Sequence, residues 1–227
     1  MTHTLSWQEQ PLDWEEHVAR HAPHALTLGS KFSQDAWEAL PDLILSNQKL
    51  LEEKVRLALE EKLTSVSLTL HLDNAGKGGV LPIAHWEDQP LISVLRDPGG
   101  PYERWVDVRL LQAHQRPVVN EVSLIAGKLD ETHIGMITAY PSSASRPFPN
   151  EAHQHTNPEF YAECVGFWKH HQFVGEAGEI LYSAQHMKTK GIELERFDLI
   201  EAAHKIEEAL SPFLPTIAHR PYRRPQG

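Results

Sequence analysis

The stretch that decides the fold is His133-Ile134-Gly135-Met136-Ile137-Thr138-Ala139-Tyr140-Pro141. Its apolar residues predict a buried strand, and Pro141 ends that strand because proline cannot donate to a β-ladder. Side chains alternate between the two faces of a strand, so Thr138 and Tyr140 are expected to share one face. The strand therefore presents a hydroxyl and a phenol side by side.

Composition limits the classes of protein to consider. The chain has 227 residues, 41% of them hydrophobic, which is enough for a globular core. It contains no apolar run long enough to cross a bilayer, and its first residues lack the layout of a signal peptide. We therefore expect no membrane contact and a protein that is cytoplasmic, or that is delivered to another cell by a specialised route. The one cysteine, Cys164, excludes an internal disulfide and is expected to be a buried, inert thiol.

The net charge of −10 argues against a general polyanion binder. Acidic and basic residues nearly balance over residues 71–150, which contain the Thr138 and Tyr140 strand. Any contact with RNA is therefore expected to be local.

Helices are predicted on both sides of a central sheet. A segment with Trp14, Val18 and His21 on one side comes first, Ser33 is positioned to cap the next helix, and a longer helix is expected from Ser46 or Asn47 to about Lys62. After the sheet, Asn157-Pro158-Glu159 is typical of a helix start, and further helices are expected near 177–190 and 196–210.

The central part of the sequence has the period of strands. Residues 65–72 alternate, with Val66, Leu68, Leu70 and Leu72 inward, and residues 73–79 are expected to form a loop. Strands are also expected at 105–110 and 118–125. Their close spacing predicts an antiparallel meander.

The predicted class is therefore α+β, with N-terminal helices, a central antiparallel β-meander and C-terminal helices. The expected regions are 1–63 (helical), 64–142 (sheet with the candidate site), 143–156 (linker) and 157–227 (helical).

Residues 64–142 resemble the barnase, EndoU, colicin and RelE group of metal-independent ribonucleases, and above all the bacterial EndoU-like toxin domains. The likeness consists of His71, Gly76-Lys77, Pro82, Trp86, Leu91-Ile92-Ser93-Val94, Asp97-Pro98 and the closing Ile137-Thr138-Ala139-Tyr140-Pro141. It implies an endoribonuclease that cleaves RNA by transphosphorylation from the 2′-hydroxyl, acts as a toxin and needs no cofactor. The implied partners are RNA and an inhibitor or immunity protein.

The resemblance also implies the site residues. His71 and His85, 14 residues apart across a Gly-rich loop, would exchange protons with the substrate, because histidine titrates near neutral pH. Lys128 would stabilise the charge that develops on the phosphate. Thr138 would hydrogen-bond RNA, and Tyr140 would stack on a base.

Two further cations, Lys77 and Arg109, are the candidate substrate-binding residues. Lys77 competes with Lys128 as the phosphate cation.

Two alternatives stay open. His153, His155, His170 and His171 could bind zinc, although adjacent histidines on a helix point in different directions. The chain could also be a non-catalytic immunity or adaptor protein, since its acidic charge suits a basic partner.

Overall fold

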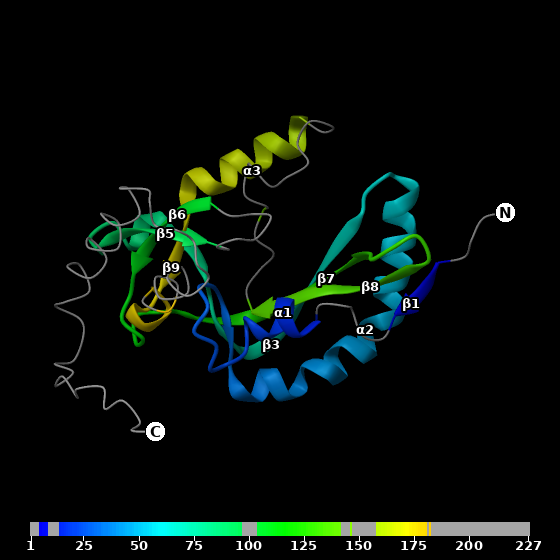
Figure 1. Cartoon of the computed structure of the whole chain (residues 1–227), viewed down its shortest axis with the longest axis horizontal. Helices are drawn as coiled ribbons and strands as arrows, with labels where there is room; N and C mark the ends of the chain where they lie inside the picture. The colour runs from blue at the N-terminus through cyan, green and yellow to red at the C-terminus, as the bar shows by residue number, and fades with distance from the viewer. Residues whose placement is uncertain are drawn as a thin grey trace, which may run out of the picture.

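The computed structural model describes residues 5–8, 14–96, 104–141, 146, 158–180 and 182. It confirms the α+β class, with helices packed on mixed β-sheets (Figure 1). The described strands form a five-stranded sheet in the order β1-β8-β7-β3-β2 and a four-stranded sheet in the order β4-β9-β6-β5.

The first sheet is built around three long antiparallel strands. Its members are β1 (Ser6–Gln8), β2 (Lys31–Phe32), β3 (Ser65–Lys77), β7 (Val118–Lys128) and β8 (His133–Pro141). β3 pairs with β7 and β7 with β8, while β1 runs parallel to β8 at one edge. β8 ends at Pro141, as the sequence predicts.

One face of this sheet forms the main core with α2 (Gln34–Glu60). Leu51 and Val55 of the helix are fully buried against Val122 and Leu124 of β7. The alternation predicted for β3 is confirmed, because Val66, Leu68, Leu70 and Leu72 pack on this core while Ser65, Ser67, Thr69 and His71 are exposed.

α2 replaces two separately predicted helices by one helix of 27 residues. Ser33 caps it as predicted, since the Ser33 hydroxyl accepts a hydrogen bond from the Ala36 N–H at 3.2 Å. The helix continues through Pro41, and the side chains of Ser46 and Asn47 bond to backbone carbonyls one turn earlier. These features weaken the regular ladder and account for the bend of α2 around the sheet in Figure 1.

The second sheet takes its strands from distant parts of the chain. It consists of β4 (Val80–Pro82), β5 (Leu91–Arg96), β6 (Arg104–Leu110) and β9 (His171–Gly175), with the 3-10 turn η1 (Ile83–His85) after β4. β9 follows α3 (Pro158–His170), which begins at the predicted proline. Its core contains Val94, Val108, Phe173 and Ile180.

The prediction of one antiparallel meander is wrong. β4, β5 and β6 lie between β3 and β7 in the chain but belong to the second sheet, and β6 pairs with β9 in parallel. β3 also continues past a bulge to Lys77, where a loop was predicted. Alternation identifies a strand, but the partner depends on which apolar faces meet.

The strands also cross the expected region boundaries. β1 and β2 come from residues 1–63 and join β8 and β3, while β9 comes from residues 157–227 and joins β4 and β6. The predicted linker and the helix at 196–210 lie outside the described residues, whereas helical structure begins at 177 as expected.

A buried cluster of charges joins the two sheets. The Arg116 guanidinium lies 3.0 Å from both carboxylate oxygens of Glu179 and donates to the Gly78 carbonyl at 2.7 Å and to the Gly29 carbonyl. The Lys31 ammonium lies 3.0 Å from the same carboxylate. Burial lowers the pKa of Lys31, and the Glu179 carboxylate opposes this shift.

Two glycines let the backbones at this junction approach closely. Gly76 has φ +149°, and a Cβ added there would lie 2.0 Å from the Lys31 carbonyl oxygen. A Cβ on Gly79 would lie 2.2 Å from the Ser30 nitrogen. The segment before β2 can therefore lie directly on the end of β3.

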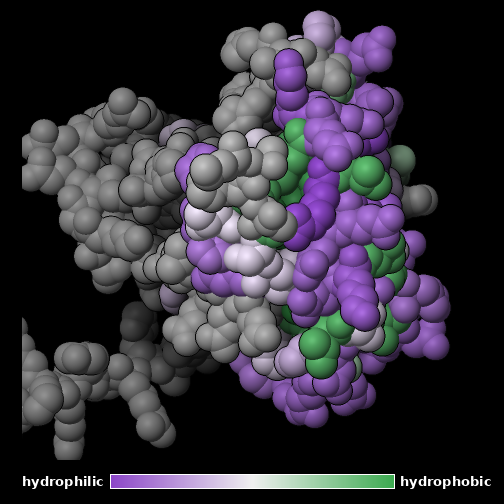
Figure 2. All heavy atoms as spheres, turned by 90° about the vertical axis from the view of Figure 1, so that its right-hand side faces the viewer, coloured by the Kyte–Doolittle hydropathy of each residue, from purple (hydrophilic) through white to green (hydrophobic). Residues whose placement is uncertain are grey.

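The surface on the side of α2 and β1, which lies on the right in Figure 1, is mostly hydrophilic with separate hydrophobic patches (Figure 2). Within the described ranges, no helix is both long and apolar enough to cross a bilayer. Cys164 is buried as predicted, and burial raises the pKa of its thiol.

Candidate functional site

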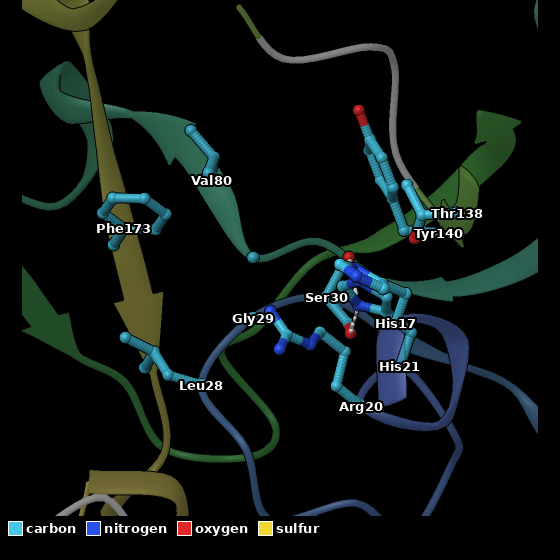
Figure 3. A pocket seen from close by; sticks show the side chains of 11 residues that line it. His17, Arg20, His21, Leu28, Gly29, Ser30, Val80, Thr138, Tyr140 and Phe173 are labelled. Atoms are coloured by element: carbon cyan, nitrogen blue, oxygen red, sulfur yellow. Dashed lines mark hydrogen bonds between the residues drawn. The ribbon is translucent and has the colours of Figure 1, made fainter. Parts of the chain in front are cut away.

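A pocket of about 250 Å³ lies where the end of the first sheet, α1 (Trp14–Ala19) and the second sheet meet. One wall is polar and the other is apolar (Figure 3). The polar wall consists of His17, Arg20, His21, Ser30, Thr138 and Tyr140, the apolar wall of Leu28, Val80 and Phe173, and Gly29 and Gly79 complete the lining.

The side of the pocket that carries His17, Arg20 and His21 comes from α1 and the turn after it. His17, Arg20 and His21 have the spacing i, i+3 and i+4, which places side chains on one side of a helical turn. The turn continues past the end of the helix, because the His21 N–H donates to the Val18 carbonyl at 2.9 Å. Val18 is fully buried in the main core, so packing fixes the direction in which the other three side chains point.

Hydrogen bonding orients the imidazole of His21. Its Nδ1 lies 2.8 Å from the Ser30 carbonyl oxygen, which can only accept, so Nδ1 carries the proton. In the neutral ring the basic lone pair is then on Nε2. The ring centroid lies 5.6 Å from that of Tyr140, and the two planes are tilted by 41°.

Tyr140 and Thr138 form the β8 side of the pocket. They share one face of the strand, as the sequence predicts, and both line the cavity. Tyr140 pairs with Ser123 of β7, which pairs in turn with Thr69 of β3. Tyr140, Ser123 and Thr69 therefore lie in register on one face of the sheet, where Ser123 is fully buried.

The structure does not bring His71 into this pocket. His71 lies on β3, one strand beyond β7, and its Nε2 is 3.0 Å from the Asp73 carboxylate. Two strand spacings of about 4.8 Å separate β3 from β8, so His71 is roughly 10 Å or more from Tyr140. Its side chain is 72% exposed. The side chain of His85 lies outside the described residues.

The three predicted cations are also outside the pocket, each with another partner. Lys128 lies 3.0 Å from the Glu131 carboxylate at the far end of β7, and Lys77 lies 3.0 Å from Glu176 at the junction of the sheets. Arg109 donates to the Gln172 side chain and to the carbonyls of Glu87 and Gln89. Arg109 therefore links elements of the second sheet.

His17, Arg20 and His21 were not predicted as site residues from the sequence. The signal was present, because His17, Arg20 and His21 repeat at helical spacing. The sequence instead predicts His21 on one side of a helix with Trp14 and Val18.

The structure gives no support to a metal site in the part of the chain that it describes, where no group of three or more His, Cys, Asp or Glu side chains could hold a metal ion. His170 is exposed at the end of α3, and His171 stacks on Phe167 with ring centroids 3.9 Å apart. His153 and His155 lie outside the described residues.

Comparisons with known proteins identify no family. No family model matches the chain, and no curated protein sequence is similar to it. Among solved structures, the chain is similar to a conserved hypothetical protein from Toxoplasma gondii ME49, at 16% identity and a TM-score of 0.36, over 50% of this chain and 73% of that one. The function is therefore argued from the site itself.

Proposed function

We propose that this protein is a metal-independent endoribonuclease whose active site is the pocket between α1 and β8. The observation that carries the proposal is that Thr138 and Tyr140 line one cavity together with His17, Arg20 and His21. RNA cleavage of this kind needs a base, an acid and a cation at the phosphate. The pocket wall supplies side chains for all three roles.

His21 acts as the general base. Its Nδ1–H is held by the Ser30 carbonyl, so Nε2 can accept the proton of the ribose 2′-hydroxyl. The 2′-oxygen then forms a bond to phosphorus, and the bond from phosphorus to the 5′-oxygen breaks. The protonated His17 gives its proton to the departing 5′-oxygen, which leaves a 2′,3′-cyclic phosphate and a 5′-hydroxyl.

Arg20 stabilises the phosphate during this step. A guanidinium keeps its charge at any working pH and can donate two parallel hydrogen bonds to phosphate oxygens. Thr138 and Tyr140 belong to the same polar wall and add two hydroxyl groups to it. This local set of donors reconciles RNA binding with a chain whose net charge is −10.

The test is cleavage of a single-stranded RNA oligonucleotide by the full chain in EDTA. We expect products that end in 2′,3′-cyclic phosphate, because imidazole groups provide the proton transfers. His21→Gln should reduce the rate about 10²-fold or more, as expected for a lost general base. His24→Gln is the matched control, since His24 is exposed and is not among the pocket residues.

A His71→Ala variant separates this site from the one implied by the sequence. If the pocket is the active site, the exposed His71 can be removed with little change in rate. A large loss in His71→Ala with none in His21→Gln would move the chemistry to the open face of the sheet. Absence of cleavage by the parent protein would reject the nuclease and favour the interaction protein.

A further inference from the structure

We infer that the apolar wall of the pocket is a nucleobase subsite, so that the enzyme takes one unpaired nucleotide between its two sheets. This inference rests on the proposed function and specifies its substrate. It follows from the different chemistry of the two walls, the size of the cavity, and the hydrogen bonds already made by the backbone that lines it.

The two walls together fit a ligand that is anionic at one end and flat and apolar at the other. His17, Arg20 and His21 lie across the cavity from Leu28, Val80 and Phe173 (Figure 3). A nucleotide has this distribution, because its phosphate is charged and its base presents an apolar face. A free phosphate would use only the first wall.

The apolar wall is rigid. Phe173 lies in the middle of β9, where it pairs with Val80 of β4 on one side and with Val108 of β6 on the other. The Phe173 ring also packs on Trp168, with centroids 4.8 Å apart. Leu28 packs on the same cluster from the segment before β2. A base that enters the pocket therefore meets a preformed surface.

The size of the cavity selects a single nucleotide. Its volume of about 250 Å³ lies near the lower end of the range of small-molecule pockets, roughly 300–1,000 Å³. We expect a cavity of this size to take one nucleotide, whose base must be unpaired before it can lie between the two walls. The substrate is therefore single-stranded RNA or an unpaired loop.

Recognition at this subsite depends on apolar contact more than on hydrogen bonds. Three carbonyls of the lining segments already accept hydrogen bonds, because Arg116 donates to Gly29, the His21 ring to Ser30 and the Val174 N–H to Gly79. The apolar side chains contribute no polar groups. We therefore expect binding of any base with modest preference among the four.

The experiment compares uridine 5′-monophosphate, adenosine 5′-monophosphate and ribose 5-phosphate as ligands of the full chain, by calorimetry or NMR titration. Both nucleotides should bind about tenfold or more tightly than ribose 5-phosphate, because the base adds apolar contact. Val80→Thr, which keeps the shape of the side chain, should weaken nucleotide binding about fivefold or more and leave ribose 5-phosphate binding unchanged. Val118→Thr is the matched control, since Val118 is 59% exposed on β7.

Equal affinity for ribose 5-phosphate and the nucleotides would overturn the inference, as would the absence of binding by all three ligands. The same loss in Val80→Thr and Val118→Thr would also overturn it. If Val80→Thr does not fold, Leu28→Ala makes the same comparison from the other element of the wall. RNA cleavage is measured separately. If the protein cleaves RNA but binds ribose 5-phosphate as tightly as the nucleotides, only the base subsite is refuted and the proposed ribonuclease function stands.

Discussion

Replacement of Arg116 by Ala is expected to destabilise the fold severely, because this side chain connects the two sheets. The side chain is fully buried, and its guanidinium contacts the Glu179 carboxylate and two backbone carbonyls. The two carbonyls belong to Gly29, before β2, and Gly78, after β3. Glu179 follows β9 of the second sheet, so one side chain joins the β2 and β3 end of the first sheet to the second sheet.

The structure allows the size of this effect to be worked out. Removal of one partner of a buried ion pair costs about 3–5 kcal/mol, because the other charge stays buried. Lys31 still lies 3.0 Å from Glu179 in the variant and keeps part of the compensation. The Gly29 carbonyl still accepts from the Lys31 ammonium at 3.1 Å, so only the Gly78 carbonyl loses its donor, which adds about 1–3 kcal/mol unless water replaces the bond. We therefore expect a total loss of about 3–5 kcal/mol in the free energy of unfolding.

Urea denaturation followed by circular dichroism measures this loss. The control is Lys128→Ala, which removes a lysine whose partner Glu131 is 94% exposed. Surface ion pairs of this kind contribute about 0–1 kcal/mol. The two variants each delete one basic side chain, so the difference between them reports burial.

The result that refutes this reasoning is a loss below about 1 kcal/mol in Arg116→Ala, as for a surface pair. A double variant, Arg116→Ala with Glu179→Ala, adds a second criterion. Its cost should be smaller than the sum of the two single variants, because the two side chains contact each other. Additive costs would show that the contact between Arg116 and Glu179 contributes nothing.

Three other predictions test local features. Hydrogen bonds from the Thr132 N–H and, next in size, from the His133 ring hold the pKa of Asp130 below its ordinary value of 3.8. The Asp130 carboxylate therefore stabilises the fold above pH 3.8, and this stabilisation is lost as the pH falls below that value. Carboxyl NMR titration measures the pKa, and an unshifted value would contradict the prediction. Ser33→Ala should cost about 1 kcal/mol in urea unfolding through loss of the α2 cap, and no change would show that the cap is dispensable. Gly76→Ala should cost about 1–3 kcal/mol or more, because its φ is +149° and the new Cβ would meet the Lys31 carbonyl; a melting curve like that of the parent would reject this reasoning.

The sequence by itself predicted the strands β3, β6, β7 and β8 and the helices α1, α2 and α3, but not the strands β1, β2, β4, β5 and β9. The alternation of 65–72 predicted the buried side of β3. The apolar repeat after Ser46 predicted the buried side of α2 only in part, because Leu51 and Val55 are buried whereas Leu50 and Leu57 are exposed. Ser33 and Pro158 predicted helix starts correctly. These features depend on local backbone geometry, and each is encoded within a few residues.

The Thr138 and Tyr140 pair was also predictable, because two residues apart on a strand share a face whatever the strand packs against. Their partners were not. The pocket places them beside His17, Arg20 and His21, more than a hundred residues earlier in the chain, and leaves His71 on the open sheet. That arrangement depends on the packing of α1 against β8 through Val18.

Only the tertiary structure decided which strands pair and where the sheets join. Short strands close in sequence are expected to pair with each other, yet β3 pairs with β7 across three intervening strands. The buried Arg116, Lys31 and Glu179 hold the two sheets together at that point. A charged residue in a sequence is normally solvated, and burial with its partners is determined only when distant segments meet.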